Sequence, residues 1–233
     1  MNMRFYSSPL TKIVIKYLQQ LLDEKHRQSV KGMISAVAER VKNAAYREYS
    51  PEEYVSSRNL SSALAERLRA YGVSRIREGP MPKFVYGFFR PSEEGTIYIG
   101  RFQFLPREYI AMHEAAHNLQ KKSGMLGKYS TREIEGAANA IALLEYYKMS
   151  NGKGWLSKAV EIMYNLDGNS AITSVAGMIP YLRETMSAFR ALKLQGITPE
   201  SYNPAKAPEY MEIAVSGQKH ESYSAASLCP AYK

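Results

Sequence analysis

The stretch His113-Glu114-Ala115-Ala116-His117, followed by Glu135, decides how the rest of this chain is interpreted. Histidines four residues apart lie on one face of an α-helix, one turn from each other, so His113 and His117 can bind the same metal ion. Glu114 points about 100° away around that helix. It is poorly aimed to be a ligand beside the histidines but well aimed to hold a water molecule on the metal. The spacing therefore predicts a metal-binding helix.

Two carboxylates follow closely enough to supply a third ligand, Glu133 and Glu135. The run Ser130-Thr131-Arg132-Glu133 is a capping box, in which the Glu133 side chain turns back to the backbone N–H of Ser130 and opens a second helix. Glu135 lies in the next turn. We predict Glu135 as the third ligand and keep Glu133 as the alternative.

Small residues share the predicted face of Glu135 on this second helix. Ala138 and Ala142 would let it approach the histidine helix closely. Asn139, one turn on from Glu135, is predicted to hydrogen-bond the free nitrogen of a ligand histidine, because metal-binding histidines usually need such a partner.

Composition describes an ordinary globular protein of 233 residues, 45% hydrophobic and 23% charged. No apolar run is long enough to span a membrane, and the first residues lack the pattern of a signal peptide. A single cysteine, Cys229, excludes an internal disulfide framework and favours a reducing compartment. We therefore expect a cytoplasmic protein without membrane contact.

The net charge of +9 is unevenly placed along the chain. Residues 1–90 hold 16 Lys and Arg against 8 Asp and Glu, whereas residues 91–233 hold 15 against 14. A basic excess favours attraction to nucleic acid or another acidic partner. The alternative interpretation is a solvated surface, because acidic residues are interspersed with the basic ones.

The hydrophobic periodicity predicts an α+β fold that is mainly helical. The resemblance of the His113, Glu114, His117 and Glu135 pattern to that of zincins implies a zincin-like arrangement, with a small antiparallel sheet, the histidine helix and the glutamate helix, preceded by N-terminal helices. The predicted regions are a basic helical region over residues 1–72, a catalytic domain over 73–196 and an irregular tail over 197–233, which holds four prolines. Helices are predicted over residues 10–28, 30–48, 51–71, 106–123, 131–148, 155–166 and 170–194 (with a kink or break at Pro180), and strands over 83–89 and 96–99, with a third around 73–77.

Residues 80–150 resemble a gluzincin, the zincin group that includes thermolysin and the aminopeptidase N type. The match is His113-Glu114-x-x-His117, then 17 intervening residues, then Glu135. Glu135-Gly136-Ala137-Ala138 resembles the E-G-x-A stretch of aminopeptidase-like members. Glu135-x-x-x-Asn139-x-x-Ala142 is similar to the matching helix of small bacterial zincins that cleave phage-type repressors.

The resemblance implies a site with one Zn²⁺ held by His113, His117 and Glu135, with Glu114 as general base. The predicted strand falls where gluzincins have the edge strand that pairs with substrate, which implies substrate binding along Thr96, Ile97, Tyr98 and Ile99. There is no G-x-M-E-N run, so exopeptidase action is not supported. The residue that stabilises the transition state is unassigned among Tyr98, Tyr146, Tyr147, Tyr164 and His220.

Together these features predict a zinc-dependent endopeptidase acting on peptides or proteins. The alternative is a basic nucleic-acid-binding protein whose zinc site is non-catalytic or regulatory. Two simpler interpretations remain. The metal site could serve binding without catalysis, or the two histidines could be ordinary helix residues that bind no metal. A further hypothesis is that Cys229, in the tail, reaches the zinc and blocks the water position.

Overall fold

The computed structural model describes residues 46–81, 85–101, 103–165 and 181–226, with side chains described as far as residue 218. The helix expected over residues 10–28 lies outside these ranges, as do most of the one expected over 30–48, residues 166–180 with Pro180, and Cys229. The side chain of His220 is also outside the description.

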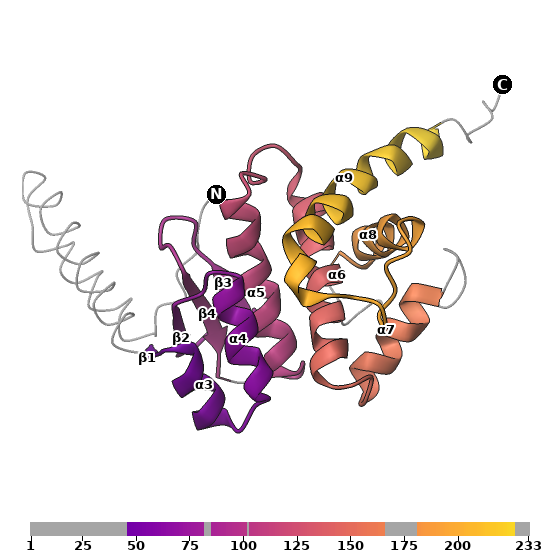
Figure 1. Ribbon diagram of the computed structural model, residues 1–233. Coiled ribbons are helices and arrows are strands. Elements are labelled where there is room, and N and C mark those ends of the chain that lie inside the picture. Colours follow the sequence, from indigo (N-terminus) through magenta and orange to yellow (C-terminus); the bar gives the residue numbers. More distant parts are fainter. Residues whose placement is uncertain (1–45, 82–84, 102, 166–180, 227–233) are drawn as a thin grey trace, which may run out of the picture. The chain divides into compact units, whose positions relative to one another are not determined.

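Four short strands form one mixed sheet in the order β1-β2-β4-β3 (Figure 1). They are β1 (Arg47–Tyr49), β2 (Arg75–Gly79), β3 (Gly87–Phe89) and β4 (Thr96–Gly100). The predicted hairpin is confirmed, because β3 pairs antiparallel with β4. The expectation of a wholly antiparallel sheet is wrong, because β2 runs parallel to β4 on its other side.

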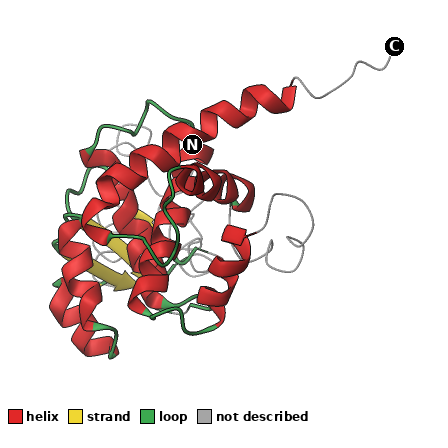
Figure 2. Cartoon of the chain, turned by 45° about the vertical axis from the view of Figure 1, so that its right-hand side comes forward, coloured by secondary structure: helices red, strands yellow, loops and turns green. Residues whose placement is uncertain are grey.

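Helices make up most of the described chain, so the fold is mixed α/β and mainly helical (Figure 2). The helices are α3 (Pro51–Arg58), α4 (Ser62–Ala70), α5 (Arg107–Lys122), α6 (Thr131–Met149), α7 (Trp155–Asn165), α8 (Leu182–Leu194) and α9 (Ala207–Ala226), with a short 3₁₀ helix, η2 (Pro204–Lys206).

Three predicted elements differ from the structure. The helix expected over residues 30–48 does not extend to its predicted end, because strand β1 begins at Arg47. The helix expected over 51–71 is two helices, because Asn59 adopts a left-handed conformation (φ 51°) that ends α3, and asparagine tolerates this conformation well. The tail expected to be irregular carries α9.

Helix α6 is the centre of the helical part and packs against α5, α7, α8 and α9. Its residues from Ala137 to Leu144 are almost completely buried all round the helix, which is the pattern of a helix enclosed by others. Ala138 and Ala142 are fully buried on α6, which packs against α5 among other helices.

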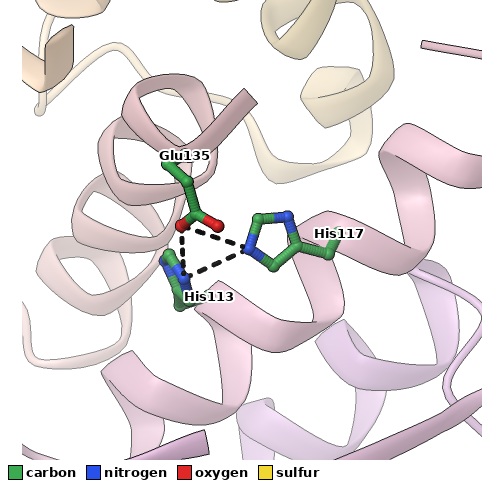
Figure 3. Close-up of side chains that lie close together, drawn as sticks. All are labelled: His113, His117 and Glu135. Atoms are coloured by element: carbon green, nitrogen blue, oxygen red, sulfur yellow. Dashed lines mark hydrogen bonds and ion pairs between the residues drawn. The ribbon is translucent and has the colours of Figure 1, made fainter. Parts of the chain in front are cut away.

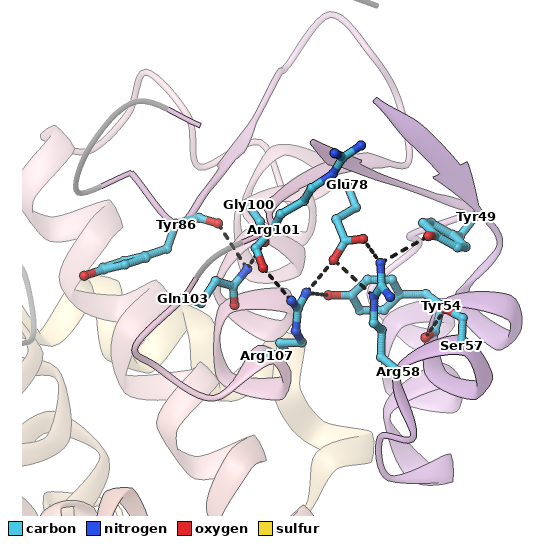
Figure 4. A network of polar contacts seen from close by, with 10 residues as sticks. All are labelled: Tyr49, Tyr54, Ser57, Arg58, Glu78, Tyr86, Gly100, Arg101, Gln103 and Arg107. Atoms are coloured by element: carbon cyan, nitrogen blue, oxygen red, sulfur yellow. Dashed lines mark hydrogen bonds and ion pairs between the residues drawn. The ribbon is translucent and has the colours of Figure 1, made fainter. Parts of the chain in front are cut away.

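A buried carboxylate, Glu78 at the end of β2, fixes the start of α5 against the sheet (Figure 4). Arg58 from α3 and Arg107 from the first turn of α5 both form ion pairs with it. Arg107 also donates to the backbone carbonyl of Arg101 at 2.6 Å. Because opposite charges are held together away from water, this network ties the sheet to the helix that carries the histidines.

Residues from Arg47 onward form one compact unit, so β1, α3 and α4 belong with the histidine helix rather than with a separate region ending at residue 72. Among the described residues, no helix combines the length and apolarity that crossing a membrane requires.

Candidate metal centre

Two helices bring three ligand-type side chains to one point (Figure 3). His113 and His117 project from the same face of α5, and Glu135 projects from α6. The Nε2 atoms of the two histidines are 3.2 Å apart, and Oε2 of Glu135 lies 3.4 Å from Nε2 of His113 and 3.5 Å from Nε2 of His117. This group could hold a metal ion.

The capping box decides which carboxylate reaches the histidines. The Ser130 side chain accepts from the backbone N–H of Glu133, while the Glu133 carboxylate accepts from the backbone N–H of Ser130 at 2.7 Å. Glu133 is thereby occupied at the helix start. Glu135, two residues later, is the carboxylate that faces the histidines, in agreement with the prediction.

The spacing of the three atoms fits a tetrahedral ion. Ligand atoms about 2.0–2.1 Å from a tetrahedral zinc lie about 3.3–3.4 Å from one another. The three measured separations of 3.2, 3.4 and 3.5 Å lie close to this range. Two imidazole nitrogens and one carboxylate oxygen are also ligands that zinc accepts, and three protein ligands leave a fourth position open.

The hydrogen-bond partners of the histidines differ from the prediction. Nδ1 of His117 lies 2.8 Å from Oε1 of Gln120, and Nδ1 of His113 is buried without a hydrogen-bond partner. Asn139 instead accepts a hydrogen bond from the Tyr109 hydroxyl at 2.8 Å. The expectation that Asn139 bonds the free nitrogen of a ligand histidine is therefore wrong. Gln120 takes that place from one turn along the same helix.

Burial and mutual contact shift the pKa values of the site in different directions. Burial raises the pKa of Glu114, although the nearby histidines oppose this. For Glu135 burial works upward, but its contacts with both histidines outweigh burial and lower the pKa. Burial lowers the pKa of His117, yet its contacts with Glu135 and the charge of Glu114 raise it overall. Glu135 is thus held ionised, while Glu114 is shifted toward the range of a general base.

A cleft of about 420 Å³ opens at the three ligands. Its lining is mainly apolar away from the ligands and Glu114, and comprises Gly87, Phe88, Phe89, Pro91, His113, Glu114, His117, Leu126, Gly127, Tyr129, Thr131, Ile134 and Glu135. The Glu114 side chain packs against Gly87, where a Cβ atom would lie only 2.8 Å from its Cγ atom. Glu114 therefore reaches the cleft beside the metal ligands because β3 has no side chain there.

The strand beside the cleft is β3, not β4. Strand β4 lies inside the sheet with β2 and β3 on its two sides, and Thr96, Ile97, Tyr98 and Ile99 are all buried. It has no unpaired edge, so the expectation that substrate pairs with Thr96–Ile99 is wrong. Of the two edge strands, β1 and β3, it is β3 whose three residues line the cleft.

The tyrosines considered as transition-state donors lie away from the cleft. The hydroxyl of Tyr98 contacts Glu93 and Arg77, that of Tyr147 contacts Glu161 and Glu200, and that of Tyr164 donates to the carbonyl of Ile197. Tyr146 is also absent from the cleft lining. The tyrosine that does line it is Tyr129, and its only sequence signal is its place just before the Ser130 capping box.

Comparison of the chain with protein-family models, with characterised proteins and with solved structures gives no match. Arguments about function therefore rest on the geometry of the site itself.

Proposed function

We propose that this protein is a zinc-dependent endopeptidase. The observation that carries the proposal is the convergence of His113, His117 and Glu135 at the spacing of a tetrahedral zinc site, with the buried carboxylate of Glu114 beside them in a cleft. A binding-only metal site does not need a carboxylate of raised pKa next to an open ligand position.

The residues of the site divide the chemistry between them. A bound zinc ion supplies Lewis acidity, which lowers the pKa of a water molecule toward about 7 and polarises a scissile carbonyl. Glu114 takes the proton from the attacking water and passes it to the leaving amine. Its buried position in the cleft favours this role, because it keeps the carboxylate beside the open ligand position.

An extended peptide is proposed to bind along β3. No described strand pairs with the outer edge of Gly87–Phe89, and adding a strand there would lay the peptide across the cleft. The surrounding Phe89, Leu126 and Ile134 favour apolar side chains next to the scissile bond. Internal peptide bonds are the expected substrates, because strand addition recognises the main chain rather than a terminus.

The test is hydrolysis of denatured casein and of a mixed peptide library by the zinc-loaded full chain. Glu114→Gln is expected to keep about one zinc per chain and to lose about 10²–10⁴-fold in rate, the usual contribution of a general base. Glu135→Ala is expected to lose zinc. Full activity of zinc-loaded Glu114→Gln would contradict the mechanism.

Glu133→Gln is the matched control for both variants. Glutamine supports a capping box as glutamate does, and Glu133 lies two residues from Glu135 without facing the histidines. This variant is expected to keep zinc and activity. Loss of zinc from Glu133→Gln as large as that from Glu135→Ala would remove the assignment of the third ligand.

The nucleic-acid alternative depends on the residues before the compact unit. Within the described part of residues 46–90, five arginines form ion pairs with glutamates, namely Arg58, Arg67, Arg69, Arg77 and Arg90. Their charge is therefore largely balanced. Binding of the full chain to DNA or RNA that weakens steeply with salt would support the alternative, and absence of binding at low salt would end it.

A further inference from the structure

Gln120 lies one turn after His117 on α5 and is fully buried. Its Oε1 atom is 2.8 Å from Nδ1 of His117, the ring nitrogen that points away from Glu135. A buried amide in contact with a ligand-type histidine limits where that histidine can carry its proton.

The other end of the amide settles its orientation. Nε2 of Gln120 donates to the backbone carbonyl of Ile134 at 2.8 Å and to Sδ of Met211 at 3.3 Å. Both of these partners are acceptors, so the amide nitrogen belongs on their side. The amide oxygen then faces His117, and because it can only accept, Nδ1 of His117 must carry a hydrogen.

We propose that Gln120 is the positioning residue of the metal centre. It holds His117 in the Nδ1–H tautomer, which leaves the lone pair of Nε2 facing His113 and Glu135. It also ties α5 to α6 at Ile134, the residue directly before Glu135. One buried amide thus orients a ligand on one helix and fixes the backbone next to a ligand on the other.

His113 provides the contrast within the same site. Its Nδ1 atom is buried without a hydrogen-bond partner, so no side chain holds this ring through Nδ1 as Gln120 holds that of His117. Of the two histidines, only His117 is oriented through Nδ1. Loss of the Gln120 amide would therefore leave neither histidine with a hydrogen-bond partner at Nδ1. The inference rests on the metal site of the proposed function and does not require peptidase activity.

The test compares Gln120→Met with Asn118→Leu. Met has a length similar to that of Gln but cannot accept from His117. Asn118 is a fully buried amide on the same helix that donates to the carbonyl of Tyr71 at 2.8 Å, so its loss also removes a buried hydrogen bond but away from the ligands. Gln120→Glu keeps an oxygen that accepts from Nδ1 of His117 but loses the donor to the carbonyl of Ile134, so it separates the two contacts of the amide.

Two readouts are taken on each folded variant. The first is the ¹⁵N–¹H correlation of the histidine rings in the metal-free protein, at a pH where the rings are neutral. The second is zinc affinity by competition with a chelator. The parent and Gln120→Glu are expected to show His117 as Nδ1–H. Gln120→Met is expected to lose this preference and about 10–100-fold in zinc affinity, the usual effect of removing such a partner. Asn118→Leu is expected to stay within about threefold of the parent.

An Nε2–H tautomer of His117 in the parent would overturn the inference without any variant. So would an unchanged tautomer and zinc affinity in Gln120→Met, or an equal loss of affinity in Asn118→Leu. If the parent bound no zinc at all, the proposed function would fall, while the tautomer of the metal-free ring would still decide the role of Gln120. The two failures are therefore distinguishable.

Discussion

Gly87→Ala is the most informative single substitution outside the ligands, because it pushes on Glu114 without removing any functional group. Gly87 lies on the edge strand β3, directly against the Glu114 side chain. An added Cβ atom would lie 2.7 Å from Oε1 and 2.8 Å from Cγ of Glu114, and 2.9 Å from the carbonyl oxygen of Tyr98. The Tyr98 carbonyl belongs to the neighbouring strand, so β3 has little freedom to move aside.

The distances give the size of the effect. Carbon atoms in contact are about 3.5–4.0 Å apart, so Cγ of Glu114 must retreat by about 0.7–1.2 Å from its 2.8 Å position. A displacement of about 1 Å at a reacting group costs about 100-fold in rate. Overpacking of this kind also costs about 1–3 kcal/mol of stability, and each kcal/mol lowers Tm by about 2–4 °C in a chain of this size.

The assay is kcat/KM for peptide hydrolysis alongside zinc content and Tm. Gly87→Ala is expected to keep about one zinc per chain and to lose about 100-fold in kcat/KM. Gly100→Ala is the control, since its Cβ would meet the flexible Met81 side chain at 3.0 Å and the carbonyl oxygen of Tyr86 at 3.2 Å, and not Glu114. Parent-like activity in Gly87→Ala, or an equal loss in Gly100→Ala, would refute the role of Glu114 in this geometry.

Three further predictions concern stability. Gly136→Ala would place a Cβ atom 2.5 Å from Cβ and 2.6 Å from the backbone carbon of Glu184, so we expect a loss of about 1–3 kcal/mol in urea unfolding; an unchanged midpoint would contradict the close packing of α6 on α8. Glu78→Ala leaves two arginines beside a buried gap and is expected to cost about 3–5 kcal/mol, against less than about 1 kcal/mol for Glu161→Ala in an exposed pair; similar costs would rule out the network as a support of α5. Burial raises the pKa of Glu145 above its ordinary value of 4.5, so the folded chain binds more protons than the unfolded chain above that pH, and the free energy of unfolding falls as pH rises through this window. The free energy of unfolding of Glu145→Gln should rise relative to that of the parent as pH increases from about 4 to 8. A difference between the two that stays constant over this range would show that Glu145 does not titrate in this way.

Features that depend on neighbours along the chain could be predicted. The spacing of His113 and His117 fixes them on one helix face whatever else the chain does. The capping box at Ser130 is equally local, and it separated Glu133 from Glu135 before any tertiary contact was known. These two local rules identified the three residues that converge.

The sequence of helix α9 contains apolar residues at helical spacing, but the prolines around them pointed to an irregular tail. Its buried residues recur at helical spacing through Ala207, Tyr210, Met211, Ala214, Val215 and Gln218. The four prolines Pro199, Pro204, Pro208 and Pro230 predicted an irregular tail. Pro204 and Pro208 lie in the first turns of η2 and α9, where a missing backbone N–H costs nothing.

The sequence by itself determined α5 and α6, the ligand face of α5 and the carboxylate by which α6 meets it. Only the tertiary structure decided that β3 rather than β4 is an edge strand, that Gln120 rather than Asn139 contacts a ligand histidine, and that Tyr129 lines the cleft. Strand order and side-chain contacts between helices depend on which distant segments meet, and neither residue periodicity nor capping encodes that choice. The ligands come from rules of one helical turn, whereas the surroundings that tune them come from packing across the whole unit.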